Sequence, residues 1–217
     1  MNRKNQQQAS PTRLSREESQ ARTREGLIQA ATRLFAEKGY GGTSIRDIAE
    51  QSGHSQGAFY SNFHSKEELL LEMLRQHMQA EAVQLDTLVE QKQRTPAEIL
   101  DDLEAWASAL DQDPHWCMLS IELQLHAQRS ATFAAAYQAV WLQHRDVLAQ
   151  WMARLFAERQ LQMPAAPQDI ASTFMALAHG LALQRAATGS GASGRLMVVL
   201  LRGLMALSLS QNVLDRS

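Results

Sequence analysis

The chain has 217 residues and is 45% hydrophobic, which suits a globular protein with a sizeable core. Its single cysteine, Cys117, excludes an intrachain disulfide and is compatible with a reducing cytosol. The longest apolar stretch, residues 196–209, is interrupted by Arg202 and is shorter than the ~20 residues that span a bilayer. No apolar segment follows Arg3 and Lys4, so we expect a cytoplasmic protein without a signal peptide or a membrane partner.

The net charge of −2 is divided unevenly along the chain. Residues 1–66 carry ten Lys or Arg and six Asp or Glu, a net charge of +4, whereas residues 67–217 carry a net charge of −6. A basic N-terminal part followed by an acidic remainder is typical of a protein with one face for nucleic acid and another that avoids it.

The first segment, residues 1–18, is polar and is predicted to be a flexible arm. Such an arm either has no role or contacts phosphates or the minor groove of DNA through its basic residues. These residues are Arg3, Lys4, Arg13 and Arg16.

A helix is predicted to follow the arm, because Leu27, Ala31 and Leu34 recur on one face. Lys38 and Gly39 are typical of its C-terminal end. The prolines fall in the arm, at predicted helix starts or between helices, and no segment alternates with period two, so the sequence predicts an all-α fold.

Two short helices joined by a glycine turn are predicted for residues 44–60. Ser44 and Asp47 have the spacing of a capping box at a helix start. Gly53 ends that helix, and Ser55 can cap the next one. This arrangement is a helix-turn-helix, whose second helix can enter the DNA major groove.

Residues from about Arg24 to Leu74 resemble the DNA-binding domain of the tetracycline-repressor (TetR) family of bacterial transcription regulators. The matching pieces are Ala31-x-x-Leu34-Phe35-x-x-x-Gly39-Tyr40, Thr43-Ser-Ile-Arg-Asp-Ile-Ala49, Gly57-Ala-Phe-Tyr60 and Tyr60-x-Asn62-Phe63-x-x-Lys66-x-x-Leu69. Two positions depart from the commonest pattern: His54 replaces an aliphatic residue, and Gln56 stands where lysine is frequent. The second departure concerns which operator is bound, not whether DNA is bound.

The resemblance implies two kinds of DNA contact, since phosphate contacts position a protein and base contacts specify its site. It places Thr43, Ser44, Tyr60, His64 and Lys66 near phosphates. Ser55, Gln56 and Gly57 lie at the tip of the recognition helix, where Gln56 could read adenine and Gly57 permits close approach. Arg46 could read guanine or bind a phosphate. The alternatives are a packing role for Gly57 and a buried ring for Tyr60.

The remainder of the chain is predicted to be helical. A long helix opens near Lys66 and is long enough to bridge two domains. Residues 95–98 combine an N-cap, a first-turn proline and a capping-box glutamate. Further helices are predicted to start at Asp113-Pro114 and after Ser130. Two more are predicted for residues from about 168 to 187 and from 195 to 210.

This helical part is expected to hold a small-molecule pocket, because the family usually keeps a cavity there and such pockets are apolar with a few placed polar groups. The candidate lining residues are Trp106, Met118, Glu122, His126, Phe133, Tyr137, Trp141, His144, Phe174, Met175 and His179. For any single one of them, plain core packing is the competing interpretation.

Metal and catalytic chemistry find little support. His126, His144 and His179 lie on three different helices, but their spacing matches no metal motif, so we expect no metal and no cofactor. His115 and Cys117 are neighbours without a nucleophile-elbow or P-loop pattern around them, so we expect no enzyme. A redox role for Cys117 is a minority interpretation.

The last two predicted helices combine leucines with small residues, which let helix backbones approach closely. In the family this pair dimerises as a four-helix bundle with its twin, and the alternative is internal packing only. The expected interface residues are Leu177, Gly180, Leu181, Leu196, Leu200, Gly203, Leu204 and Leu207.

The sequence therefore predicts a DNA-binding transcription regulator, a homodimeric repressor that a small hydrophobic or aromatic effector releases from palindromic double-stranded operator DNA. Its expected parts are the arm of residues 1–18, a helix-turn-helix domain of residues 19–66, and a ligand-sensing and dimerisation domain of residues 67–217. The alternative is a DNA-binding protein of the same fold without a small ligand, acting through a protein partner or as an architectural factor. An enzyme or carrier without DNA binding conflicts with the charge division.

Overall fold

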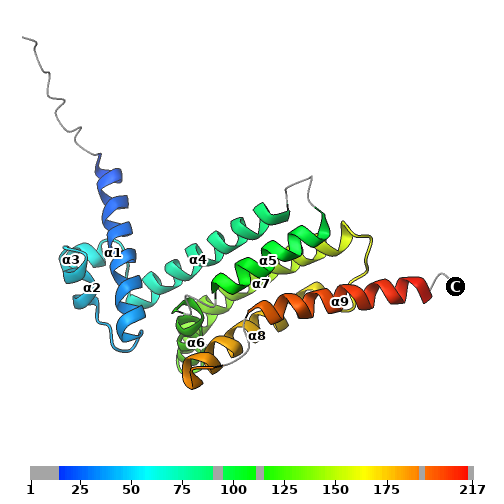
Figure 1. Cartoon of the computed structure of the whole chain (residues 1–217). Coiled ribbons are helices and arrows are strands. Elements are labelled where there is room, and N and C mark those ends of the chain that lie inside the picture. Colours follow the sequence, from blue (N-terminus) through cyan, green and yellow to red (C-terminus); the bar gives the residue numbers. More distant parts are fainter. Residues whose placement is uncertain (1–14, 90–94, 111–114, 191–193, 215–217) are drawn as a thin grey trace, which may run out of the picture. The chain divides into compact units, whose positions relative to one another are not determined.

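The structure is a computed structural model, and it describes residues 15–89, 95–110, 115–190 and 194–214. Every regular element in these residues is an α-helix, which confirms the all-α prediction. Packing divides the chain into two compact units, Met1–Lys66 and Glu67–Ser217 (Figure 1). None of the described helices combines the length and hydrophobicity needed to traverse a lipid bilayer.

The described residues of the N-terminal unit form three helices, and a fourth begins at its last residue. They are α1 (Arg16–Lys38), α2 (Ile45–Gln51), α3 (Gln56–Tyr60) and α4 (Lys66–Val89). The C-terminal unit continues with α5 (Pro96–Leu110), α6 (His115–Ala127), α7 (Ala131–Ala157), α8 (Pro167–Thr188) and α9 (Arg195–Leu214).

Helix α1 begins inside the segment expected to be a flexible arm. The Ser15 hydroxyl accepts a hydrogen bond from the Glu18 amide at 3.1 Å, and the Glu18 carboxylate accepts one from the Ser15 amide at 2.7 Å. This reciprocal capping box fixes the first turn, so residues 16–18 are helical rather than part of an arm. The rest of the expected arm lies outside the described residues.

The N-terminal unit is held by a small apolar core in which α1 packs against α2 and α3. Leu27 and Ile48 are fully buried, and Phe59 and Phe63 pack with ring centres 5.8 Å apart. Burying each such side chain contributes about 1.5–3 kcal/mol. Arg24 places its guanidinium 4.1 Å above the Phe63 ring and donates to the Asn62 carbonyl at 2.8 Å, which ties the end of the α3 turn to α1.

The C-terminal unit is a helical bundle in which α7 lies against α8, α9 against α5, and α6 against both α7 and α8 (Figure 1). Its core includes Leu103, Trp151, Leu155, Phe156 and Ile170. The predicted caps are present, since Ser130 accepts from the Phe133 amide, and Thr95 and Glu98 bond to each other. Helix α9 extends four residues beyond the predicted end at Ser210. The predicted start at Asp113-Pro114 lies outside the described residues.

Candidate DNA-binding surface and ligand cavity

The turn between α2 and α3 has the geometry that the sequence predicts. The Ser44 hydroxyl accepts from the Asp47 amide at 3.1 Å, and the Ser55 hydroxyl caps α3 by accepting from the Ala58 amide at 3.1 Å. Gly53 has φ of +72°, a conformation that a side chain would strain, so glycine is required in the turn. His54 is half-buried, and a side chain at Gly26 of α1 would lie 3.5 Å from its ring.

Helix α3 presents an exposed polar edge. Gln56 and Gly57 are exposed, and Tyr60 keeps 53% of its surface while Phe59 beside it is fully buried. The competing interpretation of Tyr60 as a buried ring is therefore wrong. His64, just beyond α3, is exposed as well. The amide of Gln56 and the backbone at Gly57 can thus meet a groove without rearrangement of the domain.

Helix α2 contributes side chains that already have partners. Arg46 is exposed and pairs with Glu50 one turn later, with 2.7 Å between Nε and Oε1. The hydroxyl of Ser44 donates to the Asp47 carboxylate at 2.6 Å, and this bond, together with one from the Ser44 amide, lowers the pKa of Asp47. A phosphate at this helix start would therefore compete with a carboxylate that is already in place.

Thr43 and Lys66 do not fit the phosphate-contact prediction. Thr43 is 2% exposed, and its hydroxyl donates to the Gly39 carbonyl at 2.9 Å and also lies 3.2 Å from the Leu34 carbonyl oxygen. Lys66 directs its ammonium inward, donating to the carbonyls of Tyr40 at 2.8 Å and Thr43 at 2.7 Å. That ammonium also lies 4.0 Å from the centre of the Tyr40 ring. Both side chains hold the loop between α1 and α2 in place.

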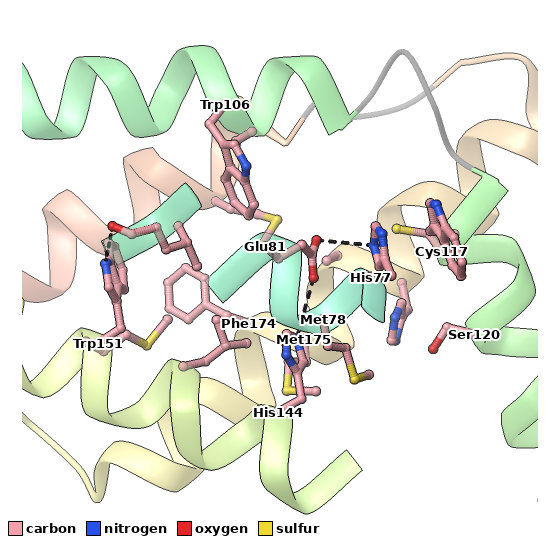
Figure 2. A pocket seen from close by; sticks show the side chains of 18 of the residues that line it. His77, Met78, Glu81, Trp106, Cys117, Ser120, His144, Trp151, Phe174 and Met175 are labelled. Atoms are coloured by element: carbon pink, nitrogen blue, oxygen red, sulfur yellow. Dashed lines mark hydrogen bonds and ion pairs between the residues drawn. The ribbon is translucent and has the colours of Figure 1, made fainter. Parts of the chain in front are cut away.

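An apolar cavity of about 150 Å³ lies within the C-terminal unit (Figure 2). Helices α4 to α9 all contribute to its lining. Six of the eleven predicted pocket residues line it: Trp106, Trp141, His144, Phe174, Met175 and His179.

The other five predicted residues, Met118, Glu122, His126, Phe133 and Tyr137, do not line this cavity. His126 instead contacts the Glu67 carboxylate at 2.6 Å, and its ring packs 4.7 Å from that of Phe133. Tyr137 is buried beside a shallower hollow that Trp141 and His179 also border. Burial raises the pKa of Tyr137.

Sequence reasoning missed the contribution of α4. Leu74, His77, Met78, Glu81 and Leu85 all line the cavity. Leu74, Met78, Glu81 and Leu85 are spaced by three or four residues, with His77 one turn before Glu81, and this spacing is the sequence signal of a single helix face. Trp116 and Cys117 of α6 were also missed as lining residues.

The polar groups of the cavity centre on Glu81, which extends between two imidazoles (Figure 2). Its carboxylate lies 3.5 Å from Nε2 of His77 and 3.7 Å from Nε2 of His144. Burial lowers the pKa of His144 and of His179, which favours the neutral form of both rings. His77 stacks on Trp116, with ring centres 4.2 Å apart. In the part of the chain that the structure describes, no three His, Cys, Asp or Glu side chains are grouped to hold a metal ion.

Helices α8 and α9 expose part of the face expected to dimerise. Leu196, Leu200 and Leu207 keep 44%, 46% and 59% of their surface, and Gly180 and Gly203 have open space above their Cα atoms. Leu177 is half-buried. Two expected interface residues instead serve the internal core, because Leu181 is buried and Leu204 packs against the core of the C-terminal unit.

Comparison with known proteins identifies the family. Residues 27–73 match the sequence model of the family described as "Bacterial regulatory proteins, tetR family". The HTH-type transcriptional repressor AcnR of Corynebacterium glutamicum is 27% identical over 178 residues, which cover 79% of this chain and 86% of AcnR. An uncharacterised HTH-type transcriptional regulator of Bacillus subtilis, YuxN, is 54% identical over 48 residues, 22% of this chain and 16% of YuxN.

The fold also resembles solved structures. The transcriptional regulator FadR of Bacillus subtilis, solved in complex with stearoyl-CoA, superposes with a TM-score of 0.65 at 15% identity, over 83% of this chain and 96% of that one. These matches assign the helix-turn-helix part of the chain, residues 27–73, to the TetR family of bacterial regulatory proteins, and they support a regulator of that family. The family match and the named relatives are transcriptional regulators, which supports a DNA-binding repressor rather than an enzyme.

Proposed function

We propose that this protein is a homodimeric repressor whose affinity for a palindromic operator falls when a small apolar or aromatic effector enters the cavity of the C-terminal unit. The observation that carries the proposal is the cavity itself, to which six helices contribute and which is lined mostly by aromatic, leucine and methionine side chains. Soluble proteins keep few apolar voids unless they are used, because an empty cavity forfeits packing energy.

The size of the cavity limits the effector. A volume of about 150 Å³ is close to that of an apolar cavity that holds one benzene ring. FadR, a protein of similar fold, has been solved with stearoyl-CoA, which supports a small-molecule ligand for a protein of this fold. The effector proposed here is smaller, with a body about the size of a single ring.

The chain itself offers a route from cavity to DNA. Helix α4 supplies five lining residues and begins at Lys66, the last residue of the N-terminal unit. A ligand that favours one position of α4 shifts the population toward conformers in which two recognition helices no longer match successive major grooves, roughly 34 Å apart.

Homodimerisation supplies the second recognition helix, since a palindrome is read by two copies of one motif. The exposed leucines of α8 and α9, with Gly180 and Gly203 open between them, form an apolar face suited to a second copy. This face would bury side chains that are otherwise costly to leave in water.

The test begins with an operator fragment selected from genomic DNA by the purified protein. Ala178 lines the cavity, so Ala178→Phe should fill part of it and prevent single-ring compounds from changing operator affinity. Ala186→Phe is the matched control, because Ala186 lies on the same helix and is exposed. Fluorescence anisotropy of labelled operator should show effector-dependent release by the wild type and by the control, and none by Ala178→Phe. Equal release by all three proteins would place the sensor elsewhere.

A further inference from the structure

The cavity has a one-sided charge. Among the described residues that line it, Glu81 is the only acidic side chain, and there is no lysine or arginine. Glu81 keeps only 19% of its side-chain surface exposed. A carboxylate withdrawn from water into an apolar enclosure is costly unless cationic or hydrogen-bonding groups compensate it.

The protein compensates this carboxylate incompletely. The Nε2 atoms of His77 and His144 lie 3.5 and 3.7 Å from it, beyond the 2.7–3.2 Å typical of an N–H···O bond. A carboxylate can accept about four hydrogen bonds, so two distant imidazoles leave acceptor capacity directed toward the cavity. His144 is 9% exposed, and burial lowers its pKa, so it does not supply a full positive charge near pH 7.

The aromatic lining of the same cavity suits a cation as well. Trp106, Trp116 and Trp141 all line the cavity. The face of an indole ring carries negative electrostatic potential and attracts cations more strongly where water is excluded. Trp106 donates its N–H to Gln84 at 2.9 Å, so its one polar donor is engaged outside the carboxylate's surroundings.

We propose that the effector of this cavity is a small organic cation, with an ammonium group held by Glu81 and an aromatic or aliphatic body packed against the tryptophans. This inference deepens the proposed function and rests on the same cavity. A neutral ligand would leave the carboxylate uncompensated, and an anionic one would place two negative charges together in an enclosure of low polarity.

Three single-ring probes of nearly equal size separate these cases: benzylamine, which is positively charged at neutral pH, benzyl alcohol and benzoate. Isothermal titration of the full-length protein should show benzylamine binding at least about tenfold more tightly than benzyl alcohol or benzoate. The reason is that only the ammonium group of benzylamine can form a charge-assisted hydrogen bond with Glu81. Glu81→Gln should reduce this preference to less than about threefold.

The matched control is Glu72→Gln, which removes the same charge from the same helix at a residue that does not line the cavity. It should leave the preference for benzylamine unchanged. The comparison of the three probes on the wild type tests the inference without any substitution. If benzylamine fails to bind the wild type, or binds no more tightly than benzyl alcohol, the inference is overturned. A preference that persists in Glu81→Gln overturns it equally.

Operator titrations with the same probes distinguish this inference from the proposed function. Release of operator by benzyl alcohol as readily as by benzylamine would overturn the cation inference and leave the sensor function standing. Glu81-dependent binding of benzylamine with unchanged operator affinity would support the cation site and contradict the sensor function.

Discussion

The inward position of Lys66 leads to the prediction that Lys66→Ala destabilises the N-terminal unit. The ammonium donates two hydrogen bonds, at 2.8 Å to the Tyr40 carbonyl and 2.7 Å to the Thr43 carbonyl, and lies over the Tyr40 ring. A hydrogen bond to a charged group contributes about 1.5–3 kcal/mol, and an exposed cation–π contact about 0.5–1 kcal/mol. Because Lys66 is half-buried and water replaces part of these bonds, we expect a loss of about 2–4 kcal/mol in the local free energy of opening.

The assay must report on the N-terminal unit alone. All four tryptophans lie after residue 100, so tryptophan fluorescence follows the C-terminal unit. Amide hydrogen exchange measured by mass spectrometry resolves peptides from residues 24–66, and the expected loss accelerates their exchange about thirtyfold or more. Arg33→Ala, at an exposed position on α1, should change the free energy by less than about 0.5 kcal/mol.

The opposite outcome would restore the phosphate role of Lys66. In that case Lys66→Ala would leave exchange unchanged while lowering the salt dependence of operator binding by roughly 0.9 per subunit.

Three further predictions concern DNA reading, assembly and pH. Gln56→Ala should relax preference at one base pair per half-site by about 1–3 kcal/mol in a binding selection; unchanged specificity would exclude base reading by Gln56. Leu200→Glu should yield monomers in sedimentation, while Val83→Glu, at a position of similar exposure on α4, should leave dimers; if both variants are dimers, the interface lies elsewhere. Burial lowers the pKa of His144 in the folded state, so below about pH 6.5 the unfolded chain binds more protons than the folded one. The free energy of unfolding therefore decreases as the pH is lowered, by at most about 1.4 kcal/mol per pH unit. Urea titrations between about pH 7 and pH 5 should show a shallower fall in His144→Gln; an identical fall would remove this histidine from the explanation.

The sequence predicted the helices well because their caps are local. Ser44 with Asp47, and Thr95 with Glu98, bond within three residues of each other, so short patterns determine where those helices begin. The same locality explains the correct position of the turn at Gly53.

Roles that depend on distant contacts were not visible in the sequence. Lys66 bonds to carbonyls 23 and 26 residues earlier, and no local pattern distinguishes an inward lysine from one that faces DNA. The periodicity of a helix gives its apolar face but not which neighbour covers that face. For that reason His126 was assigned to a pocket although it contacts Glu67, and Leu181 to an interface although it packs internally.

If the cavity and the operator-binding surface are coupled, each ligand must weaken the binding of the other by the same factor. Benzylamine affinity should be measured by titration for the free protein and for the protein saturated with operator. Operator should weaken benzylamine binding by the same factor by which benzylamine weakens operator binding, a factor of about 5–150. Equal benzylamine affinity in the two states would contradict the claim that this cavity controls DNA binding.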